Sequence, residues 1–230
     1  RGRSDPSERL CGTDMNARED ILARVRANLG VKAQDTARQN TALEVIAARQ
    51  QGPRPVVGGD LAARFQVKSE AMSSTVETVQ TDAEVPAAVA RYLASNGLAP
   101  QAVCWPQLAV LDWAAAGLQV AGRAANGNDP IGITGCFCAI AETGTLMLLS
   151  GPETAATTSL LPETHIAVVP ASRIVPAMEE GFALLRTEHG ALPRAVNFVS
   201  GPSRTGDIEQ TIVLGAHGPY RVHLILVTGA

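Results

Sequence analysis

The residues best suited to chemistry lie in a glycine- and proline-rich loop near the C-terminus, between two apolar runs. The loop reads Ser200-Gly201-Pro202-Ser203-Arg204-Thr205-Gly206-Asp207 and continues to Gly215-Ala216-His217-Gly218-Pro219. An arginine such as Arg204 can pair with a carboxylate through two parallel hydrogen bonds, and a histidine such as His217 can transfer a proton near neutral pH. Ser203, Thr205 and Asp207 add polar groups that either bind a ligand or cap a helix. We interpret this segment as a functional loop.

The local pattern predicts how the loop is held. Residues 195–199 form a short apolar run that predicts a buried strand, and residues 205–213 carry apolar side chains at helical spacing. A strand that turns directly into a helix presents unpaired N–H groups and the positive end of the helix dipole. We therefore expect an anion or polar-ligand site. Ligands of α/β proteins bind at the carboxyl ends of strands, so we expect the site at that edge of a sheet.

A second motif, Ala141-Glu142-Thr143-Gly144-Thr145, precedes the apolar run 146–149. A carboxylate beside a buried strand is costly unless it is used or satisfied. Glu142 is therefore a nucleophile, a base or a ligand anchor, or else a structural acid bonded to backbone N–H groups. Thr143 and Thr145 are candidate anion-binding hydroxyls. We expect this motif and the first loop to form opposite walls of one site, with Glu142 and His217 as candidate catalytic residues.

Short apolar runs alternate with helical patterns through the rest of the chain, which predicts a mostly parallel sheet covered by helices on both faces. We expect His165 to be a polar residue at the edge of its strand and His223 to be structural. The expected strands are 76–79, 102–105, 118–121, 146–149, 164–169 and 222–227, and the expected helices are 82–97 and 174–186.

The N-terminal quarter has a different character. Residues 1–14 lack periodicity, and we place them outside the fold as disordered or as an upstream extension. Residues 15–59 read as a helical arm and linker, with a capping-box start at Asn16 and Glu19 and a weaker second helix over 41–51. Residues 60–230 read as the α/β domain. The arm's apolar stripe is too short to be stable alone, so we expect a docking element that supports a homo-oligomer. The stripe consists of Ile21, Leu22, Val25 and Leu29.

Composition excludes several classes of protein. The net charge is −3, with 19 basic and 22 acidic residues and no basic block, which argues against nucleic acid or anionic membranes as partners. No run approaches the roughly 18 apolar residues of a membrane span, so we expect a cytoplasmic protein. The four cysteines lack the spacing of zinc or iron–sulfur ligands, and no G-x-G-x-x-G follows a strand. We therefore expect no metal, cluster or dinucleotide on this chain.

Four motifs in series resemble the LUD-domain family, from about Met15 to the C-terminus. They are Ala141-Glu142-Thr143-Gly144-Thr145, Ser159-Leu160-Leu161-Pro162 with His165-Ile166, Ser200-Gly201-Pro202-Ser203-Arg204-Thr205 with Asp207-Ile208-Glu209, and Gly215-Ala216-His217-Gly218-Pro219. The resemblance implies a three-layer α/β/α fold similar to the sugar-phosphate isomerases and coenzyme A transferases, here with an N-terminal helical arm. It also implies a part in oxidising L-lactate to pyruvate, beside partner subunits that carry iron–sulfur clusters.

Two functional interpretations remain open at this stage. In the first, the chain is a non-cluster subunit of a lactate-oxidising complex that holds a small carboxylate or a partner surface. In the second, it is a stand-alone enzyme on an anionic metabolite, similar to an acyl or coenzyme A transferase or a sugar-phosphate isomerase, with Glu142 as nucleophile or base. A ligand-sensing scaffold without turnover is a third reading.

Overall fold

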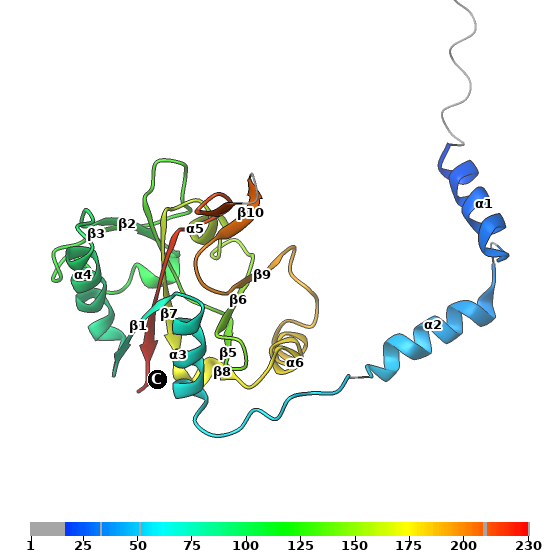
Figure 1. Ribbon diagram of the computed structural model, residues 1–230, viewed down its shortest axis with the longest axis horizontal. Coiled ribbons are helices and arrows are strands. Elements are labelled where there is room, and N and C mark those ends of the chain that lie inside the picture. The colour runs from blue at the N-terminus through cyan, green and yellow to red at the C-terminus, as the bar shows by residue number, and fades with distance from the viewer. Residues whose placement is uncertain (1–16, 33, 51, 209–210, 230) are drawn as a thin grey trace, which may run out of the picture. The chain divides into compact units, whose positions relative to one another are not determined.

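The structure of the protein is a computed structural model that describes residues 17–229 except 33, 51, 209 and 210 (Figure 1). Residues 1–14 and the capping residue Asn16 lie outside the described part. The chain divides into two units, an N-terminal arm that ends at Pro55 and a compact domain that begins at Val56.

The arm consists of two helices, α1 (Ala17–Leu29) and α2 (Thr36–Ala48), and neither has a buried residue. Helix α2 begins five residues before the expected start at Thr41, because the side chain of Asp35 accepts a hydrogen bond from Arg38 N at 3.1 Å and caps it. Ile21, Val25 and Leu29 on α1 are all exposed. Docking through this face stays a prediction.

A six-stranded parallel sheet forms the centre of the compact domain, which confirms the predicted mostly parallel α/β fold. Strand β7 lies inside the sheet and pairs with β12 on one side and β4 on the other. The spatial order is β1 (Thr75–Val79), β12 (Arg221–Val227), β7 (Thr164–Pro170), β4 (Ile131–Thr134), β2 (Gln101–Cys104), β3 (Gln119–Gly122).

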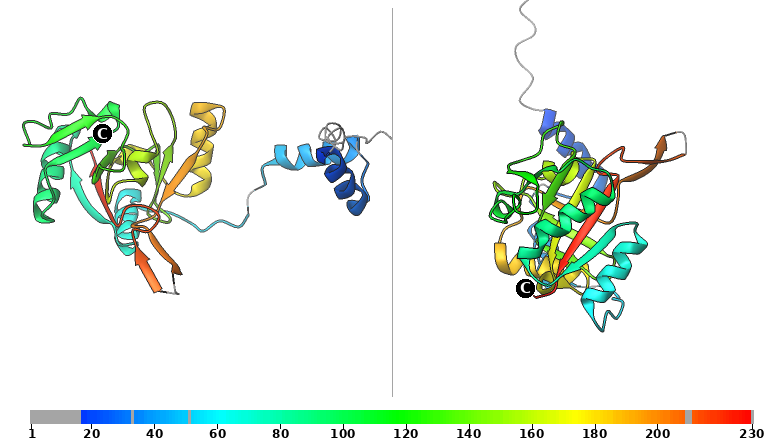
Figure 2. Two further views of the ribbon diagram at one scale, coloured as in Figure 1. Left: turned by 90° about the horizontal axis from the view of Figure 1, so that it is seen from above. Right: turned by 90° about the vertical axis from the view of Figure 1, so that its left-hand side faces the viewer.

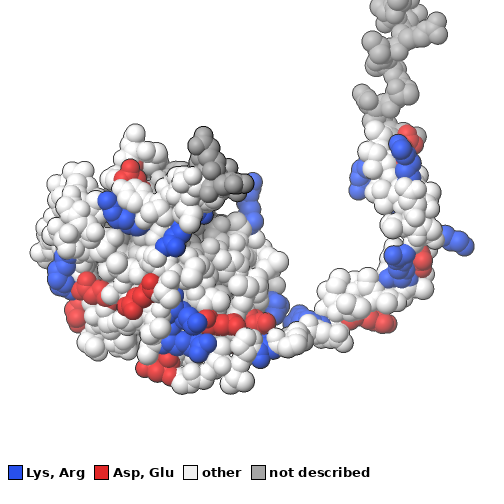
Figure 3. Space-filling view, viewed as in Figure 1, with Lys and Arg blue, Asp and Glu red and all other residues white. Residues whose placement is uncertain are grey.

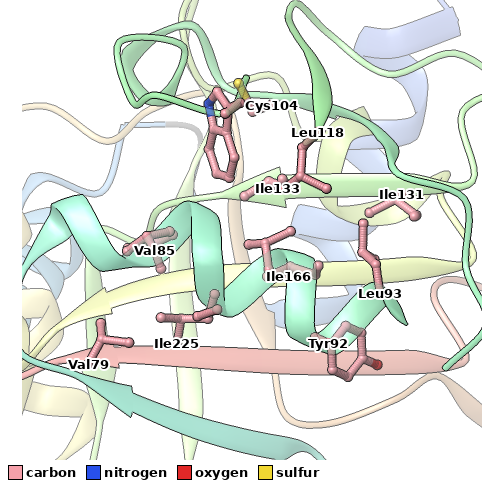
Figure 4. Packing of buried hydrophobic residues seen from close by; sticks show 14 of the residues in the cluster. Val79, Val85, Tyr92, Leu93, Cys104, Leu118, Ile131, Ile133, Ile166 and Ile225 are labelled. Atoms are coloured by element: carbon pink, nitrogen blue, oxygen red, sulfur yellow. The ribbon is translucent and has the colours of Figure 1, made fainter. Parts of the chain in front are cut away.

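One face of this sheet packs against α4 (Val85–Ser95), which follows the short helix η2 (Asp82–Glu84). Tyr92 and Leu93 of α4 meet Ile166 and Ile225 from the sheet in one buried cluster (Figure 4). Alternate residues of β7 point to opposite faces, as the two-residue period of a strand requires. Its Ile166 therefore belongs to this cluster, whereas Ala167 belongs to the cluster on the other face.

The other face is covered by α3 (Leu61–Ala71) and by a second, four-stranded sheet. Phe65 of α3 is fully buried against this face. The second sheet packs in turn against α6 (Met178–His189), where Leu185 meets Met147. Its strands, in spatial order, are β8 (Ile174–Val175), β5 (Cys138–Ile140), β6 (Thr145–Leu149), β9 (Val196–Val199).

Short elements complete the compact domain. They are η3 (Pro106–Leu108), α5 (Thr157–Leu160), η4 (Ala171–Arg173), β10 (Arg204–Ile208) and β11 (Thr211–Leu214). Helix α5 packs on β4 at Gly132, where a Cβ atom would lie only 2.0 Å from the carbonyl oxygen of Thr158. Only glycine permits this contact between helix and strand.

The helix expected over residues 205–213 is wrong, because this segment is the antiparallel hairpin β10–β11. Its second strand reads Thr-Ile-Val-Leu, and β-branched residues favour strands over helices. The hairpin (orange) stands away from the body of the domain in both views of Figure 2. The preceding strand β9 is half-buried rather than buried, because it is an edge strand of the second sheet.

The expected position of His165 is also wrong, because this residue is fully buried in the internal strand β7. Its Nε2 lies 2.8 Å from Oγ1 of Thr134, and burial lowers the pKa of the imidazole to about 4. His223 is structural, as expected: its Nδ1 lies 2.8 Å from Oγ1 of Thr75 and its ring stacks on Tyr92. Burial is the main cause that lowers the pKa of His223 to about 4. Both side chains are therefore neutral at pH 7.

Acidic and basic side chains are interspersed on the face of the compact domain seen in Figure 3. Within the described residues, no helix combines the length and the apolar character needed to cross a bilayer.

Candidate functional site

Both sequence motifs contact the C-terminal end of α3. Asp60 caps the start of this helix, where its Oδ1 accepts hydrogen bonds from Ala62 N at 2.9 Å and Ala63 N at 3.2 Å. Beyond the helix, Ser73 adopts a left-handed backbone with φ +69°. Non-glycine residues rarely take this conformation, and it turns the chain from α3 into β1.

The first motif forms the turn between β5 and β6 and lies directly on α3. Gly144 has φ +66°, and a Cβ atom there would lie 2.4 Å from the backbone nitrogen of Ser69. The Ser69 hydroxyl also donates to the Gly144 carbonyl at 3.3 Å. The glycine is therefore required by both its backbone angle and its contact with the helix.

The second motif rests on the same helix end. Gly201 has φ +78°, and a Cβ atom there would lie 2.1 Å from the carbonyl oxygen of Met72. Thr205, in the same motif, is half-buried and pairs with Val213 across the hairpin. The guanidinium of Arg204 donates to the hydroxyl of Ser73. The left-handed turn after α3 thus supplies the group that orients this arginine.

A row of three hydroxyls joins the two motifs. Oγ1 of Thr143 lies 2.8 Å from Oγ1 of Thr145, which lies 2.6 Å from Oγ of Ser200. Thr145 is buried, whereas Thr143 and Ser200 are exposed. The pairing Leu146↔Val199 between β6 and β9 brings Thr145 and Ser200 side by side. The prediction that the two motifs meet is therefore supported, although through Ser200 rather than through Ser203 or Thr205.

We call Ser73, Thr143, Thr145, Ser200 and Arg204 the motif cluster. It combines one cation with four hydroxyls, and its outer members are open to solvent. A hydroxyl both donates and accepts, so the exposed ends of the row can still bond to a ligand. The cluster can bind an anion such as a carboxylate, with the guanidinium supplying charge and the hydroxyls supplying directed hydrogen bonds.

The polar groups of Ser203 close the loop that carries His217. Its N–H donates to Pro219 O at 2.8 Å, and its carbonyl accepts from Gly215 N at 3.0 Å. Its hydroxyl accepts from His217 N at 3.3 Å. The imidazole of His217 is exposed beside the motif cluster's loop.

The two candidate catalytic residues are not brought into contact. Glu142 is half-buried, and its backbone N–H donates to Pro176 O at 2.9 Å. In the described part of the chain, neither its carboxylate nor the imidazole of His217 makes a hydrogen bond. Asp207 lies in β10, and its side chain falls outside the described residues. The structure thus assembles Thr143, Thr145 and Arg204 but does not pair Glu142 with His217.

The motif cluster lies at the amino edge of the central sheet, not at the carboxyl edge as expected. The loop ends where β12 begins, and Tyr220 N and Arg221 N both donate to the carbonyl of Glu163, which precedes β7. Ser73 likewise precedes β1. The rule for carboxyl ends fails here because this loop enters a parallel strand instead of leaving one. Because the described residues after Ser203 form a hairpin, the positive charge of the cluster comes from Arg204 and not from a helix dipole.

Sequence reasoning missed Ser73 and gave no role to the hydroxyl of Ser200. Ser73 lies in the plain segment Met72-Ser73-Ser74, which carries no motif. Its contact with Arg204 spans 131 positions of sequence. Only the tertiary fold reveals such a contact.

No group of three or more His, Cys, Asp or Glu side chains suited to a metal ion occurs among the described residues. Burial raises the pKa of the Cys136 thiol to about 12, and those of Cys104 and Cys138 to about 11. These thiols are therefore protonated at pH 7. The described cysteines, Cys104, Cys136 and Cys138, are free and do not belong to a group of ligands suited to a metal ion.

Comparison with known proteins identifies relatives. The LUD-domain profile matches residues 61–227. "Lactate utilization protein C" of Bacillus licheniformis is 39% identical over 129 residues, which cover 54% of this chain and 53% of that protein. The protein of the same name from Exiguobacterium is 38% identical over 141 residues, covering 60% and 61%. These matches span roughly half to three fifths of the relatives' length.

A solved structure shares the fold. The crystal structure of a DUF162 family protein from Deinococcus radiodurans superposes with a TM-score of 0.56 at 24% identity. The superposition covers 75% of this chain and 99% of that one.

Proposed function

Since the chain belongs to the LUD-domain family, we propose that it serves lactate utilisation, as a non-cluster subunit of a cytoplasmic complex that oxidises L-lactate to pyruvate. The observation that carries the proposal is the similarity to proteins named Lactate utilization protein C, at 38–39% identity over more than half of the chain. Iron–sulfur clusters then belong to partner subunits, because the four cysteines of this chain lack the spacing of cluster ligands.

In this proposal the motif cluster binds a carboxylate. The guanidinium of Arg204, oriented by Ser73, takes the two carboxylate oxygens, and the hydroxyls of Thr143 and Ser200 donate from the side. Arginine suits this role because its planar fork matches a carboxylate. Thr145 holds the two outer hydroxyls in place, and Ser203 holds the His217 loop.

Oxidation of lactate to pyruvate removes one proton from its hydroxyl, and one proton and two electrons from its α-carbon. His217 is the candidate acceptor of the hydroxyl proton, because its imidazole is exposed and a ring nitrogen of a neutral imidazole can accept a proton. Glu142 is the alternative base on the neighbouring turn. The two electrons leave to redox groups on partner subunits, and the proton from the α-carbon is released to solvent.

Deletion and complementation in a bacterium that carries this gene tests the proposal. A strain without the gene should fail to grow on L-lactate and grow normally on pyruvate, and the wild-type gene should restore growth. Arg204→Ala should not restore it. Arg194→Ala should restore it, because Arg194 is an exposed arginine that precedes β9, whereas Ser200 of the motif cluster follows the other end of that strand. Normal growth of the deletion strain on L-lactate as sole carbon source would refute the proposal.

Co-purification separates assembly from chemistry. If Arg204→Ala still purifies with its iron–sulfur partners, Arg204 acts on the substrate; if the partners are lost, the motif cluster is a subunit interface. A covalent substrate adduct on Glu142 of the isolated chain would instead favour a stand-alone transferase.

A further inference from the structure

Two neighbouring cavities lie at the carboxyl edge of the central sheet, opposite the edge that carries the motif cluster. The larger has a volume of about 400 Å³ and lies between the segments that follow β2, β4 and β6. The smaller, of about 250 Å³, extends toward Asp82 and Pro170, at the ends of β1 and β7. Gln107 and Cys136 line both. Small-molecule pockets typically have volumes of 300–1,000 Å³, and the carboxyl edge is where α/β proteins bind ligands.

The walls of the larger cavity are aromatic and fixed in place. Trp105 is 3% exposed, and its indole N–H donates to Ala155 O at 3.1 Å. The guanidinium of Arg173 lies over the Phe137 ring, 4.9 Å from its centroid, and His189 meets the same ring edge-on at 5.5 Å. The cavity is therefore preformed, which lowers the entropy cost of binding.

Arg173 is held rigidly at the wall and still has hydrogens to donate. Its Nε donates to the carbonyl of Phe137 at 2.8 Å, and Nη1 and Nη2 donate to the two oxygens of Glu188 at 2.8 and 2.9 Å. A guanidinium has five N–H groups, so two remain. The side chain is 32% exposed, which leaves these groups accessible.

Other polar groups on the wall are also donors. The Oγ of Ser150 accepts from Ala195 N at 2.8 Å, which leaves the hydroxyl hydrogen available. The amide of Gln107 is exposed at the junction of the two cavities and lies against Gly135, whose missing side chain leaves room beside it. Thr154 adds a further hydroxyl. Donors thus outnumber acceptors around an aromatic interior.

We propose that this carboxyl-edge cavity binds a planar aromatic or heteroaromatic molecule that carries hydrogen-bond acceptors such as carbonyl or carboxylate oxygens. The ring lies between Trp105 and Phe137, and the oxygens face Arg173 and Ser150. An apolar extension of the ligand enters the smaller cavity along Leu108 and Leu111. The site is separate from the motif cluster and does not depend on the proposed function.

The test uses three naphthalene probes of one shape, 2-naphthoate, 2-naphthamide and 2-naphthylmethylammonium, in equilibrium dialysis against the full chain. The two acceptor-bearing probes should bind, and the ammonium probe should bind at least about tenfold more weakly, a difference of about 1.4 kcal/mol. If neither 2-naphthoate nor 2-naphthamide binds at about 1 mM, the binding free energy is weaker than about 4 kcal/mol, and the proposal is overturned. Equal binding of all three would also overturn it.

Two matched variants locate the site. Gln107→Trp fills the junction of the two cavities and should reduce binding of 2-naphthamide at least tenfold. Gln101→Trp changes the opposite end of the same strand, where a separate cavity of about 390 Å³ lies, and should have no effect. Both positions are exposed, so both variants should fold. Unchanged binding by Gln107→Trp, or loss caused by Gln101→Trp, would contradict the assignment. Arg173→Lys keeps the positive charge but loses the planar guanidinium with its several N–H donors. It should weaken the binding of the acceptor-bearing probes only.

Discussion

The close contact between the first motif and α3 predicts a large difference between two glycine substitutions. Gly144 and Gly97 both have positive φ, +66° and +63°, but a Cβ at Gly97 would meet nothing within 4 Å. Gly97→Ala should therefore destabilise the protein only through the left-handed backbone, by about 1 kcal/mol. At Gly144 the Cβ would lie 2.4 Å from Ser69 N and 2.6 Å from Lys68 C, both backbone atoms. Forcing these apart adds roughly 2 kcal/mol.

Urea unfolding followed by tryptophan fluorescence measures this difference, because both tryptophans lie in the compact domain. With a slope of about 2 kcal/mol per molar urea, Gly144→Ala should unfold about 1 M earlier than Gly97→Ala. Gly201→Ala should resemble Gly144→Ala, because its Cβ would lie 2.1 Å from Met72 O. Equal midpoints for Gly144→Ala and Gly97→Ala would refute the claim that the motif turn rests tightly on α3.

Three further predictions concern buried groups. The pKa of His165 is lowered to about 4 in the folded state, below its value of about 6.5 in the unfolded chain. The free energy of unfolding is therefore highest above pH 6.5, where His165 is neutral in both states. It decreases as the pH falls toward 4, by about 1.4 kcal/mol per pH unit, because the unfolded state takes up the proton first. Urea midpoints at pH 7.5, 6 and 5 should fall in the wild type and fall less in His165→Asn; parallel curves would count against this. Thr145→Val breaks the hydroxyl row and should cost about 1 kcal/mol of unfolding free energy, and an unchanged urea midpoint would show that the row contributes nothing. The Cys104 thiol, fully buried and with a pKa of about 11, should resist iodoacetamide at pH 8 until urea unfolds the domain, and rapid labelling of Cys104 in the native chain would contradict its burial.

Periodicity made the central sheet predictable. The runs 164–169 and 222–227 became β7 and β12, because near-continuous apolar strands are typical of a parallel sheet buried on both faces. The run 76–79 became the edge strand β1. The second sheet was not predicted as a sheet, since β5 and β8 are three and two residues long. Such short segments give no readable pattern on their own. Their strand character comes from the pairing of β5 with β6 and of β8 with β5, and from packing against α6.

The motif residues were predictable as a group, but their geometry was not. The glycine-containing motifs correctly indicated the two segments that meet. The fold shows that Gly144 and Gly201 are both required by close contact with the C-terminal end of α3. The helix expected after Ser203 rested on Ile208, Thr211 and Ile212, whose spacing suits a helix over a window too short to exclude a hairpin. The edge of the sheet was wrong for a related reason, because a loop that enters β12 was treated as one that leaves β9.

The oxidation of lactate in cell extracts tests the central claim most directly. Extract from a strain that lacks this chain should not reduce a dye with L-lactate, and addition of the purified wild-type chain should restore the reaction. Arg204→Ala should restore it at least about tenfold less effectively, since a charge-assisted hydrogen bond is worth roughly 1.5–3 kcal/mol, whereas Arg194→Ala should match the wild type. Full activity of Arg204→Ala, or normal lactate oxidation without the chain, would contradict the account.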